Sequence, residues 1–236
     1  MLHLMLAPSS ENLLFPGCLD LSCTKLRYDQ DEEVYGEGTE PEFVYKVVSG
    51  AVRAQKLLSD GRRQIVAFHL PGDIFGLELS SMRGLSAEAV ADTRLLVLER
   101  KALEQVAAQN IDVARQLAAH TTRSLDDAQE HILLLGRKMA GERVAAFLLE
   151  MDQRMRPAGA MRLPMSRSDI ADYLGLTMET VSRAISEFKG RGLVTRFAAR
   201  KIKVNGRSKL RTIDAQLVVG RGNLAHPAGP FASPAS

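Results

Sequence analysis

The segment Met178-Glu-Thr-Val-Ser-Arg carries side chains that could read a base pair in double-stranded DNA. Residues four positions apart share one face of a helix, which would place Glu179 beside Arg183. The Arg183 guanidinium can donate two hydrogen bonds to guanine O6 and N7, and the Glu179 carboxylate can accept one from a cytosine N4 amine. A surface ion pair between the two, worth only a few tenths of a kcal/mol, would show the same spacing. The residue types favour reading of a G·C pair or its neighbour.

The residues around this segment predict a helix-turn-helix over residues 167–191. Ser166 and Thr177 are suited to cap the two helices, because their hydroxyl oxygens can accept hydrogen bonds from free backbone NH groups. Gly175 permits the left-handed backbone of the turn between them. The positions expected to pack the helices together are Ile170, Ala171, Leu174, Val181, Ile185 and Phe188. The face expected to enter the major groove carries Met178, Glu179, Ser182, Arg183 and Ser186.

The charge of the chain is divided between its two ends. Residues 1–100 contain 10 Lys and Arg against 15 Asp and Glu, a net charge of −5. Residues 162–211 contain 12 against 4, a net charge of +8. A basic end of this kind favours a polyanionic partner such as DNA, although an ordinary solvated surface can also be basic. The side chains predicted to contact DNA phosphates are Arg167, Ser168, Thr177, Arg200 and Lys201.

Short apolar runs separated by turn residues predict a β-rich domain before residue 100. The runs are Val44–Val48, Ala51–Leu58, Gln64–Leu70 and Leu95–Leu98. Strands of this length and spacing favour a small β-barrel or jelly roll, although a sandwich of another topology would have the same pattern.

From about residue 101 the apolar residues recur at alternating steps of three and four, the a/d pattern of a two-stranded coiled coil. The positions in this seam are Ile111, Ala114, Ala118, Thr121, Leu125, Ala128, Ile132, Leu135 and Met139. The pattern predicts a homodimer that is joined through this helix. The alternative is that the seam packs against the barrel of its own chain.

Breaks in these patterns divide the α+β chain into five parts. We expect an N-terminal extension at 1–24, a barrel at 25–108, a dimerisation helix at 109–139, a DNA-binding domain at 140–219 and a disordered tail at 220–236. The tail is rich in Gly, Pro, Ala and Ser and has little to bury.

Within the DNA-binding domain we expect a helix at Ala140–Met155, a hairpin formed by Leu193–Phe197 and Lys201–Val204, and a short helical run near Asp214–Val219. No apolar run approaches the roughly 20 residues needed to span a bilayer. The opening Met1–Ala7 lacks a basic flank and a clear cleavage site, so a cytoplasmic location is expected.

Over about residues 25–215 the sequence resembles the family of the cyclic-AMP receptor protein and the fumarate-nitrate reduction regulator. The motifs that carry the resemblance are Val44–Gly50, Pro71-Gly-Asp-Ile-Phe-Gly76, His131–Lys138, Glu142–Phe147 and the helix-turn-helix at Asp169–Arg183. The E-x-x-S-R pattern at 179–183 is typical of the fumarate-nitrate branch. The stretch from His131 to Glu150 is most similar to the FixK-type regulators of nitrogen-fixing α-proteobacteria.

This resemblance implies a double-stranded β-helix as the sensor domain, a long dimer helix and a winged helix-turn-helix. It implies that Glu179 and Arg183 read the central G·C of a TTGA half-site, and that Ser182 contacts a thymine methyl or its neighbourhood. The cyclic-AMP branch has an arginine before the glutamate, where this chain has Met178. A TTGA-N6-TCAA palindrome is therefore favoured over TGTGA. The family also implies recruitment of RNA polymerase, and the FixK likeness implies low-oxygen or nitrogen-fixation target genes.

Two departures from the family concern the signal that it senses. The cyclic-nucleotide branch binds the ligand phosphate with an Arg-Ser pair, but this chain has Leu85-Ser86 and so lacks the charged partner. The oxygen-sensing branch needs four thiolates for a [4Fe-4S] cluster, and the only cysteines here are Cys18 and Cys23. We expect neither cyclic AMP nor an iron-sulfur cofactor, although a redox role for the two thiols stays open.

The third departure is Ala128, where oxygen-regulated relatives carry an aspartate that repels its twin across the dimer. An alanine removes this like-charge contact, so dimerisation should depend less on conditions. The five histidines do not cluster at metal-ligand spacing, and no catalytic constellation stands out, so neither a metal site nor an enzyme is expected. The alternatives are a small-ligand or redox-responsive sensor of the same family whose DNA binding requires an effector, and a coiled-coil adaptor.

Overall fold

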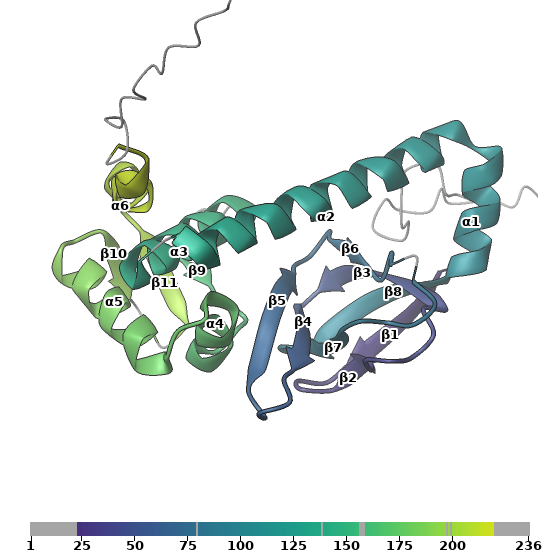
Figure 1. Ribbon diagram of the computed structural model, residues 1–236, viewed down its shortest axis with the longest axis horizontal. Helices are drawn as coiled ribbons and strands as arrows, with labels where there is room; N and C mark the ends of the chain where they lie inside the picture. Colours follow the sequence, from purple (N-terminus) through teal and green to yellow (C-terminus); the bar gives the residue numbers. More distant parts are fainter. Residues whose placement is uncertain are drawn as a thin grey trace, which may run out of the picture.

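In the computed structural model, the chain forms a β-rich N-terminal domain, a long helix and a mainly helical C-terminal domain (Figure 1). The structure describes residues 23–219 except 79, 138, 156–158, 197 and 199. The tail expected at 220–236, Cys18 and nearly all of the expected N-terminal extension lie outside these residues. The predicted α+β class is confirmed. Across the described part of the chain, no helix is both long and apolar enough to pass through a membrane.

The N-terminal domain consists of two antiparallel four-stranded sheets that face each other. The strands are β1 (Thr24–Tyr28), β2 (Glu33–Tyr35), β3 (Phe43–Ser49), β4 (Val52–Leu57), β5 (Arg63–His69), β6 (Ile74–Phe75), β7 (Ser86–Ala89) and β8 (Thr93–Glu99). The sheets have the orders β1-β8-β3-β6 and β2-β7-β4-β5, as in a jelly roll. The four predicted runs correspond to β3, β4, β5 and β8. The other strands contain no apolar run of more than two residues, so no apolar run marks them in the sequence.

The interior between the sheets holds stacked aromatic rings and a buried arginine. The ring centres of Tyr35, Tyr45 and Phe75 lie 5.1–6.2 Å apart. The Arg83 guanidinium lies 3.7 Å from the centre of the Tyr35 ring and pairs with Glu78 at 3.1 Å. A cation over an aromatic face is favourable, especially where water is excluded. This part of the barrel is therefore occupied by the protein's own side chains.

The helical stretch that follows the barrel is broken once, at Asn110. It comprises α1 (Arg100–Gln109) and α2 (Ile111–Arg137), so the helix expected at 109–139 is slightly shorter. The Asn110 Oδ1 accepts hydrogen bonds from the backbone NH groups of Asp112 and Val113 at 3.0 and 3.3 Å, which starts the new helix. Val113 is fully buried against the barrel and attaches the first turns of α2 to it.

The C-terminal domain is a winged helix-turn-helix. Its elements are α3 (Ala140–Met155), β9 (Met161–Arg162), α4 (Arg167–Leu174), α5 (Met178–Gly190), β10 (Val194–Arg196), β11 (Lys201–Val204) and α6 (Arg207–Val219). The predicted hairpin is formed by β10 and β11, although Phe197 lies outside the described residues. The sheet also includes β9, which is too short to predict. The last helix starts at Arg207, seven residues before the predicted start at Asp214. The prediction missed its first turns because they are mostly polar, with Leu210 as their fully buried residue.

The barrel and the C-terminal domain share a hydrophobic core. Ile65 and Phe68 of β5 pack in the same buried cluster as Phe147 of α3 and Tyr173 of α4. The Phe68 ring lies 5.2 Å from Tyr173 and 6.4 Å from Phe147, measured between ring centres. Figure 1 shows the β4–β5 hairpin beside α4. The orientation of the helix-turn-helix is therefore tied to the barrel as well as to α2 and α3.

Candidate nucleic-acid interface

The turn between α4 and α5 has the geometry that its residue types predict. The Ser166 hydroxyl accepts a hydrogen bond from the Asp169 NH at 3.0 Å, and the Asp169 carboxylate accepts one from the Ser166 NH at 2.9 Å, which completes a capping box. Gly175 is left-handed, with φ +60°. The Thr177 hydroxyl caps α5 by accepting from the Thr180 NH at 3.2 Å. The start of α5 is thus fixed by local hydrogen bonds.

The helix α5 separates the residues expected to pack from those expected to read DNA. Its buried residues are Val181, Ala184, Ile185 and Phe188. Glu179, Ser182 and Arg183 are all exposed on the other side. No salt bridge between Glu179 and Arg183 occurs among the described residues, and both side chains face solvent, where a partner could reach them. Hydrogen bonds from the Glu179 backbone NH and the Thr177 hydroxyl lower the pKa of Glu179, which keeps the carboxylate charged as an acceptor.

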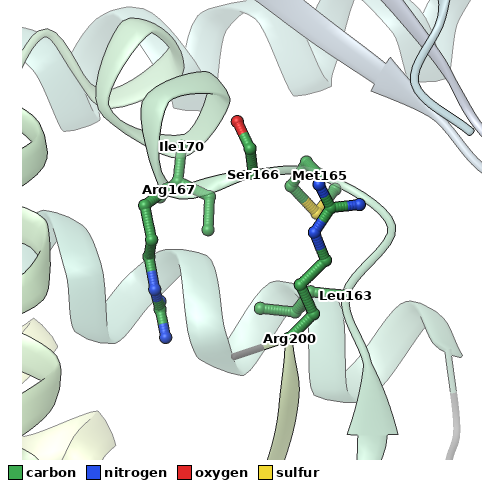
Figure 2. A pocket seen from close by; sticks show the side chains of 6 residues that line it. All are labelled: Leu163, Met165, Ser166, Arg167, Ile170 and Arg200. Carbon is green, nitrogen blue, oxygen red and sulfur yellow. The ribbon is translucent and has the colours of Figure 1, made fainter. Parts of the chain in front are cut away.

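Two of the predicted phosphate-binding arginines line a small pocket beside the wing. The pocket has a volume of about 130 Å³ and is lined by Leu163, Met165, Ser166, Arg167, Ile170 and Arg200. Figure 2 shows Arg167, at the start of α4, and Arg200, just before β11, on opposite sides of it. The Arg200 guanidinium donates to the Pro164 carbonyl at 2.9 Å, which holds this arginine next to the helix N-terminus. Ser168, Thr177 and Lys201 are exposed as well.

The predicted seam forms an apolar stripe along α2 that the described part of the chain, residues 23–219 with its gaps, does not cover. Ile111, Leu125 and Ile132 are 64%, 57% and 67% exposed. The seam residues Ala118, Thr121 and Ala128 are also exposed, which does not fit packing of the seam against the chain's own barrel. Leu135 differs, because it packs partly against the core of the C-terminal domain.

The residues that hold the helix-turn-helix in place were not predicted from the sequence. Arg143 of α3 donates to the Leu174 carbonyl at 2.9 Å and to the Leu135 carbonyl at 2.8 Å, and so connects the last turns of α4 and α2. Two barrel arginines, Arg53 and Arg63, reach Asp169 of α4. Hydrophobic and charge patterns describe single elements, and these bonds join elements far apart in sequence.

Asp169 is nearly buried but stays ionised. Burial acts to raise its pKa, but hydrogen bonds from Ser166 and the charges of Arg53 and Arg63 outweigh that effect and lower the pKa. The carboxylate therefore serves both as part of the α4 cap and as a charged partner for the barrel.

Comparisons with known proteins agree with this architecture. Two protein-family models match the sequence. The model of the cyclic nucleotide-binding domain matches residues 25–110, and the model of the Crp-like helix-turn-helix domain matches residues 142–213. Similar proteins include the nitrogen fixation regulation proteins FixK of Rhizobium meliloti and Azorhizobium caulinodans. The first is 42% identical over 79% of this chain and 85% of the relative, and the second is 44% identical over 80% and 78%. The structure of FixK2 from Bradyrhizobium japonicum has a TM-score of 0.81 and 55% identity, covering 83% of this chain and 98% of that one.

The chain therefore belongs to the CRP/FNR family of DNA-binding transcription regulators. Within that family it is of the FixK type, as the stretch from His131 to Glu150 predicted. The expectation that it is not an enzyme is confirmed, because its relatives are transcription regulators.

Proposed function

We propose that the protein acts as a homodimer that inserts two α5 helices into successive major grooves of a TTGA-N6-TCAA-type palindrome. The observation that carries this proposal is the exposure of Glu179, Ser182 and Arg183 on a helix whose start is capped and whose other face is buried. Arg183 would donate to guanine and Glu179 would accept from cytosine in each half-site. Arg167, Ser168, Thr177, Arg200 and Lys201 would set the register through phosphates.

The exposed stripe on α2 supports the dimer. A monomeric protein rarely leaves a contiguous apolar stripe uncovered, and a second copy of α2 would bury it with a/d packing. A two-fold dimer also matches the symmetry of a palindrome, with half-sites about 34–36 Å apart along the DNA.

We also propose that operator binding needs no cyclic nucleotide. The sequence has Leu85 where the nucleotide-binding branch has its phosphate-binding arginine. The nearby Arg83 is already paired with Glu78 and stacked on Tyr35, and its side chain is only 1% exposed. A ligand phosphate would have to compete with these contacts inside an occupied barrel.

Bound at a promoter, the dimer would recruit RNA polymerase and activate genes of nitrogen fixation or low-oxygen growth. This proposal is supported by the names of the relatives, which include the FixK proteins and the transcriptional activatory protein AadR of Rhodopseudomonas palustris. Transcription of a template with the palindrome upstream, using purified polymerase, would test it. A dimer that binds the site without raising transcript yield would contradict activation.

The first prediction is that the protein purified in air, without added nucleotide, binds its operator. We expect gel-shift and footprinting experiments to give a protected TTGA-type palindrome, with no change in affinity when cyclic AMP is added. Footprinting across the organism's own genome would identify the sites. Binding that appears only after anaerobic iron-sulfur reconstitution, or only with nucleotide, would instead support an effector-dependent sensor.

The second prediction concerns the phosphate contacts. Lys201→Ala should weaken binding to specific and random duplexes alike, because a phosphate contact carries no sequence information. Plots of log affinity against log salt should lose about one unit of slope for each lost contact, about two for a symmetric dimer. Lys101→Ala, which removes the same charge from α1, is the matched control and should leave the slope unchanged. An unchanged slope for Lys201→Ala would remove it from the interface.

A further inference from the structure

Four charged side chains connect the β4–β5 hairpin of the barrel to α4, the first helix of the helix-turn-helix. The Arg63 guanidinium lies 2.8 Å from a carboxylate oxygen of Asp169 and 2.7 Å from one of Asp172. Arg53 lies 3.4 Å from the same Asp169 oxygen. The paired residues are 106–116 positions apart in the sequence. We call these four residues the barrel–α4 clamp.

The clamp is largely shielded from water. The side chains of Arg53 and Asp169 are each 7% exposed, and those of Arg63 and Asp172 are 26% and 27% exposed. Charge-assisted hydrogen bonds in such surroundings are strong, and removing one partner leaves the other charge uncompensated. Within the barrel, Arg53 is also held by Glu88. Arg53 is therefore held by a second barrel residue as it reaches Asp169, and Arg63 reaches both aspartates of α4 from the start of β5.

Further contacts of the barrel with α4 and with α3 support the clamp. The Gln64 side-chain amide donates to the Asp172 carbonyl at 2.7 Å. On α3, Arg154 donates to the Phe68 carbonyl at 2.9 Å and pairs with Asp73 of the barrel. These bonds surround the shared core and restrict rotation of the C-terminal domain about the short connection between α2 and α3.

We propose that Arg53 and Arg63 are positioning residues for DNA binding: through Asp169 and Asp172 they fix the angle of α4 and α5 relative to the barrel. This proposal rests on the proposed dimer and palindrome. In that dimer, the two-fold axis runs between the two α2 helices. Each α2 packs on the barrel of its own chain through Val113. A fixed angle between barrel and α4 sets the distance between the two recognition helices, so that both engage together.

The test separates the binding of one half-site from the gain that comes from the second. The change is Arg63→Glu, which puts a third carboxylate beside Asp169 and Asp172. Affinities are measured for the full palindrome and for a duplex with one intact half-site. We expect the ratio between them to fall about tenfold or more, because the second helix no longer meets its half-site at a high effective concentration. The affinity of Arg63→Glu for the half-site duplex should equal that of the control variant described next.

The matched control is Arg62→Glu, one residue away in the same hairpin. Arg62 is 78% exposed and, within the part of the chain that the structure describes, its side chain pairs with Asp60 of the hairpin alone. The charge change is therefore the same, and the clamp stays intact. The double variant Arg63→Glu/Asp172→Arg reverses one pair and should recover part of the lost ratio. Arg63→Gln removes the charge without adding repulsion and should give a smaller fall, about threefold. It serves as the variant if Arg63→Glu does not fold.

Each outcome decides between two statements. If the wild type prefers the palindrome and Arg63→Glu or Arg63→Gln keeps the full ratio, the clamp proposal is wrong while the proposed function stands. If the wild type has no such preference, the proposed function is wrong. Small-angle scattering of the free protein then tests whether the clamp holds the barrel and the C-terminal domain together. Arg63→Glu should then have a larger radius of gyration than the wild type and Arg62→Glu, and equal radii would overturn the proposal.

Discussion

Arg183→Ala should abolish most of the preference for the operator. A bidentate arginine–guanine contact contributes about 1–3 kcal/mol of discrimination, and a symmetric dimer would lose two of them, about 2–6 kcal/mol if the half-sites act independently. Binding to random DNA should change much less, because it depends mainly on phosphate contacts. The measurement is the affinity of each protein for the palindrome and for a random duplex at one salt concentration.

A matched change of base makes this test specific to one contact. For the wild type, replacing the guanine of each half-site should cost about as much as removing the arginine, and the two losses should not add. Arg115→Ala removes the same charge from an exposed position in the first turns of α2 and should change neither affinity nor preference. Equal losses on operator and random DNA would instead make Arg183 a phosphate contact.

The parts of the structure that the sequence predicts are those governed by local rules. Ser166, Gly175 and Thr177 act within three or four residues of themselves, so their caps and turn can be read from residue type alone. The helix α3 was also predicted correctly, because its observed bounds, Ala140–Met155, are the predicted ones. Strands such as β6 and β9 have only two residues each and leave no period to detect.

The shared core and the clamp depend on long-range contacts that no local pattern encodes. Asp169 reads as an ordinary first-turn acid of α4, and only the fold brings Arg53 and Arg63 to it. Likewise, only the structure places Arg83 over the ring of Tyr35. Local signals therefore predict which helix reads DNA, whereas its orientation is a property of the whole chain.

Ala128→Asp should shift the protein from dimer toward monomer. Ala128 is exposed in the single chain, within the stretch 121–130 that makes no contact with the barrel core. In the proposed dimer it faces its own copy across the two-fold axis, so the variant would place two carboxylates close together. The loss of one subunit should weaken operator binding by about 10²-fold or more, because a single helix makes half the contacts.

Sedimentation of the wild type and the variant at the same micromolar concentration measures this shift. Ala119→Asp is the matched control, because it adds the same charge to an exposed alanine of α2 that lies outside the a/d seam. The wild type and Ala119→Asp should sediment as dimers, and Ala128→Asp as a lighter species. If all three sediment alike as dimers, position 128 does not lie at the interface, and the apolar stripe from Ile111 to Ile132 must be covered in another register.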